Sequence, residues 1–240
     1  MPEENDGKSK PQVIGLVGGL GVGATVHYYR ELAAGLERIG QPLQLSMVHA
    51  QVSRVFEHAS AGDRDGLARY LAGILGQLKA SGATLGVIPA LTPHLAIDEL
   101  LPISPLPLIS LIDPVNAAIA ARGLRRVSLM GTRFVVESDL FGKLKSVEVV
   151  RPAPDDIMFI HDTYSQLARD GMVADAKRSR LIDIAQQLCA NSGVDAILLA
   201  GTDLALIFDD TNTPFPCMDC ARAHIEAIMR TLATAPRIQS

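Results

Sequence analysis

The stretch IGLVGGLGVGAT, residues 14–25, decides the fold class of this 240-residue chain. An apolar run at 13–18 leads into closely spaced glycines, and an amphipathic segment follows at about 23–39. A short apolar run, a glycine-rich turn and a long amphipathic segment are typical of a strand, a turn and a helix in a parallel sheet. The stretch therefore predicts the opening of an α/β fold.

The same alternation continues along the rest of the chain. Further strands are expected at 44–50, 85–90, 107–110, 126–131, 147–151 and 195–201. Helices are expected near 62–81, 92–100, 113–122, 133–145, 156–170, 175–192 and 219–233. Strands that alternate with helices predict parallel sheets flanked by helices.

A weak internal repeat divides this pattern in two. VIGLVGG resembles RVSLMGT, and GVIPALT resembles ILLAGTD, so that Leu16 matches Leu129 and Ala90 matches Gly201 at nearly the same separation. The repeat predicts two pseudo-symmetric lobes whose strand tips face each other across a ligand cleft. We expect an N-terminal lobe of 11–115 plus 218–240, a C-terminal lobe of 116–217, and a disordered tail at 1–10.

Composition limits the classes of partner. Hydrophobic residues make up 48% of the chain and charged residues 20%, which predicts a globular protein. The net charge of −4, the 4% of aromatic residues and the absence of tryptophan argue against nucleic acid and against a membrane surface. A small molecule is the favoured partner.

The N-terminal residues, the length of the apolar runs and the cysteine count indicate the cellular compartment. The first ten residues, MPEENDGKSK, are polar, and the apolar runs are shorter than the roughly 18 residues that a membrane span needs. Three cysteines (Cys189, Cys217 and Cys220) are an odd number in a chain too large to depend on disulfides. These features predict a cytoplasmic protein.

The glycine-rich turn has two interpretations. Gly19, Gly21 and Ala24 fit the G-x-G-x-x-A form of the dinucleotide fingerprint, but the second expected strand ends in SMVHAQVS without the required acidic residue. Glycines before a helix also let backbone N–H groups approach an anion, and a carboxylate fits there as well as a phosphate. Gly19 is therefore a candidate binding residue.

The segment PCMDC, 216–220, followed by His224, resembles a metal site. Cys217, Cys220 and His224 could supply three zinc ligands, although no fourth ligand is evident and the order differs from that of zinc deaminases. Alternatively, the two cysteines only bracket the start of a helix. A helix N-terminus would then stabilise the Cys220 thiolate and make it a candidate nucleophile.

Two longer segments carry a family resemblance. IGLVGGLGVGATVHYYREL resembles the N-terminal signature of the aspartate/glutamate racemase superfamily, with Tyr28 and Tyr29 as its aromatic pair, and VSLMGTRFVVESDLF resembles the segment that opens the family's second lobe. The resemblance implies two pseudo-symmetric lobes, a small carboxylate or amino-acid-like substrate, catalysis without a cofactor, and a homodimer.

The residues that would do the family's chemistry are changed. The family carries Cys-Asn-Thr-x-His at one strand tip and Gly-Cys-Thr-Glu at the other, and its two thiols move a proton on opposite faces of the substrate. Here the tips read ALTPH, 90–94, and AGTD, 200–203, so Ala90 and Gly201 stand at the thiol positions. Racemisation by two cysteines is therefore not expected.

The polar neighbours of these positions persist. His94 and Asp203 are candidates for general base and general acid. Thr92 and Thr202 are placed either to bind a substrate carboxylate or to cap a helix. Two arginines, Arg54 in the loop after the second strand and Arg133 beside Thr132, are placed either to clamp a second carboxylate or simply to face solvent.

Three functions follow from these residues. The first is a divergent enzyme of the superfamily that uses non-thiol acid/base chemistry on an aspartate-, glutamate- or malonate-like substrate, with His94, Asp203 and Cys220. The second is a non-catalytic carboxylate-binding pseudoenzyme. The third is a zinc enzyme built on Cys217, Cys220 and His224. The persistence of the polar neighbours favours the first.

Overall fold

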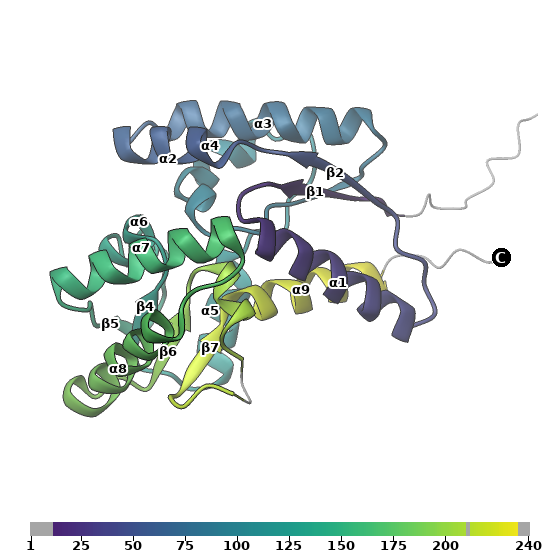
Figure 1. The fold of residues 1–240 in the computed structure, drawn as a ribbon. Helices are drawn as coiled ribbons and strands as arrows, with labels where there is room; N and C mark the ends of the chain where they lie inside the picture. Colours follow the sequence, from purple (N-terminus) through teal and green to yellow (C-terminus); the bar gives the residue numbers. More distant parts are fainter. Residues whose placement is uncertain (1–11, 210–211, 235–240) are drawn as a thin grey trace, which may run out of the picture.

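The computed structural model describes residues 12–209 and 212–234 and places them in two lobes, each a parallel sheet flanked by helices (Figure 1). The expected tail at 1–10 lies outside the described residues. The α/β fold and the two-lobed architecture predicted from the alternation and the repeat are confirmed.

The first sheet has the strand order β2-β1-β3, and its neighbours are parallel. Its strands are β1 (Ile14–Gly18), β2 (Leu45–His49) and β3 (Leu85–Val87). The strand expected at 107–110 is reduced to a single bridge between Leu108 and Gly86. The reason is that Pro107 has no N–H to donate to a ladder.

Helices cover both faces of this sheet (Figure 1). On one face, α3 (Arg64–Ala80) buries leucines in a cluster with Val17 of β1. On the other face, α1 (Val22–Arg38) and the last helix, α9 (Cys220–Thr234), share a cluster with Ile14 and Leu16. The last helix thus packs on the sheet with which the chain begins.

The second sheet repeats the first with one more strand. Its order is β5-β4-β6-β7, again parallel. The strands are β4 (Arg126–Met130), β5 (Glu148–Val149), β6 (Ala196–Leu199) and β7 (Cys217–Asp219). In each lobe the first strand is flanked by the second and the third. The sequence did not predict β7, because Pro216 and Asp219 interrupt the apolar pattern around it.

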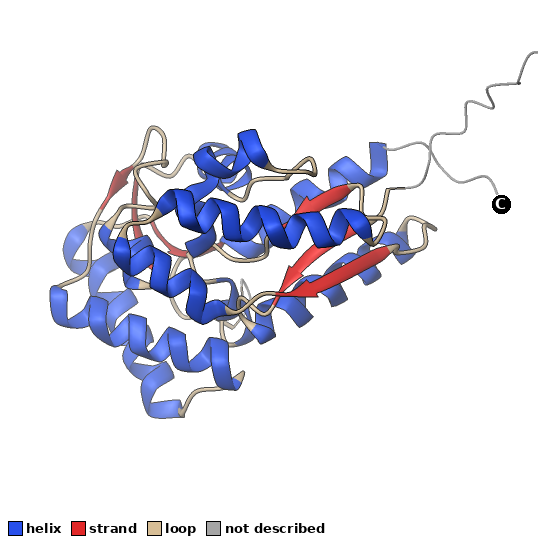
Figure 2. Cartoon of the chain, turned by 90° about the horizontal axis from the view of Figure 1, so that it is seen from above, coloured by secondary structure: helices blue, strands red, loops and turns tan. Residues whose placement is uncertain are grey.

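The second sheet is also enclosed by helices on both faces. Figure 2 shows the helices and strands of the two lobes from above. One face packs on α5 (Ile112–Ala121) and α6 (Arg133–Glu137), the other on α7 (Pro154–Asp170) and α8 (Asp175–Ser192). The lobe boundary expected between 115 and 116 falls inside α5. This helix buries Ile112, Val115 and Ile119 in one cluster with β4.

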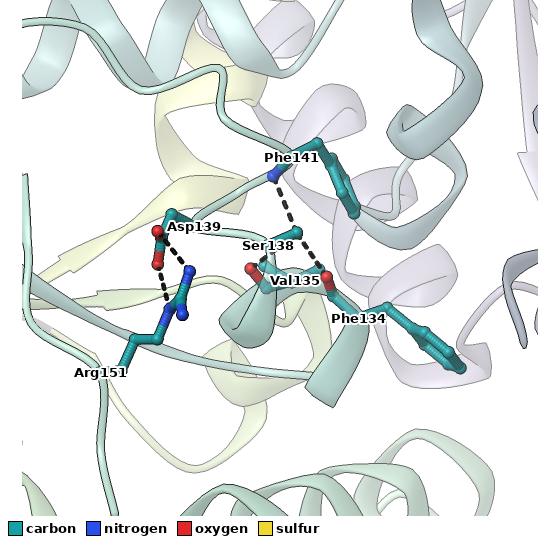
Figure 3. A network of polar contacts seen from close by, with 6 residues as sticks. All are labelled: Phe134, Val135, Ser138, Asp139, Phe141 and Arg151. Atoms are coloured by element: carbon teal, nitrogen blue, oxygen red, sulfur yellow. Dashed lines mark hydrogen bonds and ion pairs between the residues drawn. The ribbon is translucent and has the colours of Figure 1, made fainter. Parts of the chain in front are cut away.

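The helix expected at 133–145 ends early, at Glu137. Asp139, Leu140 and Phe141 have φ angles of 51, 55 and 62°, a left-handed conformation that costs non-glycine residues energy. Hydrogen bonds hold this turn (Figure 3): the Ser138 hydroxyl accepts from the Phe141 N–H at 2.9 Å, and Arg151 donates to both Asp139 carboxylate oxygens. These contacts compensate for the strain.

Several short elements complete the fold. A helix that the sequence did not predict, α2 (Val52–Ala61), follows β2 and ends at Gly62 in a left-handed cap. The remaining elements are η1 (Thr92–Ala96), α4 (Ile97–Leu100), η2 (Leu101–Ile103) and η3 (Thr202–Leu206). Within the described ranges, every helix is too short or too polar to cross a lipid bilayer.

Candidate functional site

A cavity of about 450 Å³ lies between the lobes, at the carboxyl ends of the strands. We call it the interlobe cavity. It is lined by residues 19–22, 49–53, 55–56 and 90–93 of the first lobe, and by Thr132, Tyr164, Ser165, Ala168, Arg169 and Ala200 of the second. In parallel sheets this edge is where ligands bind, and the volume falls in the range of small-molecule pockets.

The glycine-rich turn already holds an anion, and that anion is the carboxylate of Asp203. Its Oδ1 accepts from the Ala24 N–H in the first turn of α1 at 2.7 Å, and its Oδ2 accepts from the Tyr164 hydroxyl at 3.1 Å. A Cβ at Gly21 would stand 2.8 Å from Asp203 Cγ, so glycine is needed there. A carboxylate at a helix N-terminus stabilises the helix.

This geometry corrects the interpretation of Asp203 as a general acid. The side chain is fully buried, and burial raises its pKa although the Ala24 N–H bond opposes that effect. It joins the second lobe to α1 of the first, and it is not among the residues that line the interlobe cavity. Gly19, in contrast, does line the cavity, with φ +80° and a backbone packed closely against Ala50.

The side-chain position of Gly201 is filled by Tyr164. A Cβ on Gly201 would lie 2.6 Å from Tyr164 Cδ2 and 2.8 Å from Cζ, closer than real atoms approach. The Tyr164 ring is 6% exposed and lines the interlobe cavity, whereas Gly201 does not. An aromatic ring therefore forms the cavity wall at this strand tip.

Three threonines lie at or near the strand tips, and their hydroxyls make different contacts. The hydroxyls of Thr92 and Thr132 lie 3.1 Å apart across the lobe interface, and both residues line the cavity. Thr132 also caps α6, where its Oγ1 accepts from the Val135 N–H. Thr202 does not line the cavity: its hydroxyl donates to the Pro89 carbonyl at 2.9 Å. Thr202 is thus a bridge between lobes, which corrects its assignment to substrate binding.

His94 is held by the backbone. Its Nδ1 lies 2.8 Å from the Ala90 carbonyl and must donate, and its Nε2 lies 3.1 Å from the Leu111 N–H and must accept. This fixes a neutral imidazole, and burial lowers its pKa to about 4. The expected general base has no nitrogen left for a substrate, because both are used to hold the loop after β3.

The proposed zinc ligands are likewise not available. Within 12–209 and 212–234, no three His, Cys, Asp or Glu side chains are grouped to hold a metal ion. His224 accepts at Nδ1 from Tyr28 and donates from Nε2 to the Ile109 carbonyl, at 3.0 and 2.9 Å. Cys220 is fully buried, and burial raises the pKa of its thiol far above the ordinary value. Desolvation outweighs the helix N-terminus, which corrects the expectation of a reactive Cys220.

Neither predicted arginine clamp lines the interlobe cavity. Arg54 lies in the first turn of α2, not in a loop, and its guanidinium stacks 4.7 Å over the ring of Tyr70. Arg133 stacks 5.0 Å over the ring of Phe134 beside it. Both cations make cation–π contacts with these rings.

The chain is similar to a known protein family in sequence and in fold. The family model for Asp/Glu/hydantoin racemases matches residues 17–228. The chain belongs to the Asp/Glu/hydantoin racemase family. A protein from Yersinia pestis that is assigned to the Asp/Glu racemases is 22% identical, with a TM-score of 0.77, over 93% of this chain and 100% of its own.

Two further solved structures of racemase relatives have a similar fold. An aspartate racemase homologue from Pyrococcus horikoshii OT3 is 22% identical, with a TM-score of 0.72, over 92% of this chain and 99% of its own. The aspartate racemase of Picrophilus torridus is 18% identical, with a TM-score of 0.73, over 94% of this chain and 96% of its own. At such identities the likeness establishes the fold.

This racemase-family protein has cavity residues that the sequence analysis did not single out. Tyr164, Ser165, Ala168 and Arg169 lie on one face of α7, at i and i+4 spacing, and that face lines the interlobe cavity. The helical period could have grouped them. It could not have shown that this face meets the opposite lobe.

The buried histidines of this racemase-family protein make its stability sensitive to acid. In the unfolded chain His94 takes up a proton near pH 6.5, but in the folded protein only near pH 4. The unfolded state therefore binds more protons between these values, and stability falls as the pH falls through that window. We expect His94 to account for a loss of about 2 kcal/mol between pH 7 and pH 5.

Urea unfolding of the wild type and of His94→Gln at both pH values measures this loss. The variant should be less stable than the wild type at pH 7, but its loss between pH 7 and pH 5 should be smaller by about 2 kcal/mol. Equal losses in the two proteins would contradict the fixed neutral imidazole.

Proposed function

We propose that the protein binds a small carboxylate in the interlobe cavity and does not racemise it with two bases. The Thr92–Thr132 pair carries this proposal. Two hydroxyls hold two protons, and only one of them can lie in the 3.1 Å bond between the oxygens. The second proton is free for an acceptor, and a carboxylate oxygen forms the stronger kind of hydrogen bond with it.

Ser165 adds a second potential donor. Its hydroxyl oxygen is buried, has no hydrogen-bond partner among the described residues, and belongs to a residue that lines the interlobe cavity. A buried hydroxyl without a partner costs free energy that a ligand would recover. The family also supports a carboxylate, since its relative from Picrophilus torridus is an aspartate racemase.

The residues at the two strand tips argue against racemisation by two bases. A methyl group stands at Ala90 and an aromatic ring covers Gly201, and neither is a base. His94 is bonded at both nitrogens to backbone groups, and Asp203 is bonded to the Ala24 N–H and to the Tyr164 hydroxyl.

Replacing Thr92 by valine tests the proposal. The variant keeps the shape of the side chain but removes the hydroxyl. The affinity for phenylacetate, which serves as the small carboxylate probe, should therefore fall by about tenfold or more. Thr92→Ser, which keeps the hydroxyl, should bind nearly as the wild type does. Isothermal titration calorimetry gives both affinities. Equal binding by the wild type and Thr92→Val would count against the carboxylate site.

A second candidate function is one-sided proton transfer by His49. This residue ends β2 and lines the cavity, and a Cβ on Gly19 would stand 2.7 Å from its Nε2. Imidazole is the commonest general base in proteins. Exchange of a ligand α-proton by the wild type that is lost in His49→Gln would favour this candidate.

A further inference from the structure

We infer that the ligand of the interlobe cavity is a monocarboxylate that carries an apolar or aromatic substituent, and not a dicarboxylate such as aspartate. The inference rests on the proposed function and narrows the class of ligand. It follows from what covers the cavity beyond the Thr92–Thr132 pair.

Most of the wall beyond this pair has no hydrogen-bonding side chain. Leu20, Val55 and Leu91 line the cavity and are 5%, 1% and 3% exposed. Against such residues a second carboxylate would lose its water without gaining a donor, which costs several kcal/mol. An apolar substituent at the same place gains about 25 cal/mol per Å² of surface removed from water.

Aromatic rings favour the same class of ligand. Tyr164 presents its ring at the Gly201 strand tip, where a side chain on residue 201 would overlap the ring. Phe56 also lines the cavity, and its ring stacks on Phe134 of the other lobe at 6.0 Å between centroids. Rings on two sides suit an apolar or aromatic group between the lobes.

The arginine and lysine side chains of the lining do not provide a second anion site. Among the described residues that line the cavity there is no arginine or lysine other than Arg169. Its side chain is 71% exposed and lies 3.1 Å from the Asp170 carboxylate. A solvated, paired guanidinium at the rim gives a buried carboxylate little stabilisation.

Calorimetry with three probes tests the inference: phenylacetate, succinate and phenylacetamide. We expect phenylacetate to bind at least tenfold more tightly than succinate, and more tightly than its neutral amide. Succinate binding as tightly as phenylacetate or more so would overturn the inference and leave the carboxylate site standing. Phenylacetamide binding as tightly as phenylacetate, or binding of none of the three, would overturn the carboxylate site itself.

A variant pair checks that the wall sets this preference. Val52 lines the cavity in the first turn of α2 and is 37% exposed, so a longer side chain fits without repacking the core. Val52→Arg adds a cation and should narrow the ratio of phenylacetate to succinate affinity at least fivefold, whereas Val52→Gln should leave it unchanged. An unchanged ratio in Val52→Arg would contradict the inference.

Discussion

Replacing Ala90 by cysteine is expected to raise α-proton exchange on 2-phenylglycine by about 100-fold or more over the wild type. Ala90 lines the interlobe cavity, so a cysteine there would place a thiol at the cavity wall. One base on one side removes and returns the proton on the same face. We therefore expect exchange in heavy water with retention of configuration, measured by proton NMR and chiral chromatography.

A matched variant separates the thiol from a change of shape. Ala90→Ser has nearly the same size and lacks the thiolate, so its exchange should stay at the wild-type level. Exchange in the wild type and in Ala90→Ser as fast as in Ala90→Cys would show that another group moves the proton. His49 would then be the first residue to test.

The opposite strand tip should respond differently. Gly201→Cys alone should be destabilised and show no gain in exchange, because its side chain would overlap the Tyr164 ring. Adding Tyr164→Ala makes room. The triple variant with Ala90→Cys should then invert configuration as well as exchange the proton, which no single variant should do. Exchange by a stably folded Gly201→Cys protein would contradict the overlap.

Asp203→Ala is expected to lower the free energy of unfolding by about 3–5 kcal/mol. The carboxylate accepts one bond from the Ala24 N–H and one from the Tyr164 hydroxyl, and both donors are buried. Alanine leaves both without a partner and removes the negative charge from the N-terminus of α1. Urea unfolding followed by circular dichroism measures the loss.

Asp203→Asn is the control for this loss. Its amide oxygen still accepts from the Ala24 N–H, so we expect a smaller loss of about 1–2 kcal/mol. Equal losses in the two variants would mean that the charge, and not the bond to Ala24, stabilises α1. A loss below 1 kcal/mol in Asp203→Ala would contradict the role of this contact between the lobes.

Most of the fold could be predicted, because its signals are local. Short continuous apolar runs and amphipathic segments of period 3.6 depend on neighbouring residues, so they revealed both sheets and most of the helices. The exceptions also have local causes. Pro216 and Asp219 interrupt the apolar pattern around β7, Pro107 interrupts the strand expected at 107–110, and a left-handed turn at 139–141 follows the end of α6.

The site was predictable only in part. The strand tips and their residue types, including Ala90 and Gly201, could be read from the sequence. The use of each polar group depends on partners far along the chain: Asp203 binds the N–H of Ala24, 179 residues away, and Thr202 binds the carbonyl of Pro89, 113 residues away. No local pattern encodes such a pairing.

Local pattern therefore predicted the α/β class and the two lobes, and the family resemblance predicted that Ala90 and Gly201 stand at the thiol positions. Packing between the lobes established which groups remain free to meet a ligand. A side chain is available for chemistry only if its contacts leave a donor or acceptor free and if water or a ligand reaches it. Both conditions depend on tertiary structure. Both nitrogens of His94 are bonded, Asp203 is held by Ala24 and Tyr164, and Cys220 is buried. The Thr92–Thr132 pair, in contrast, lines the cavity.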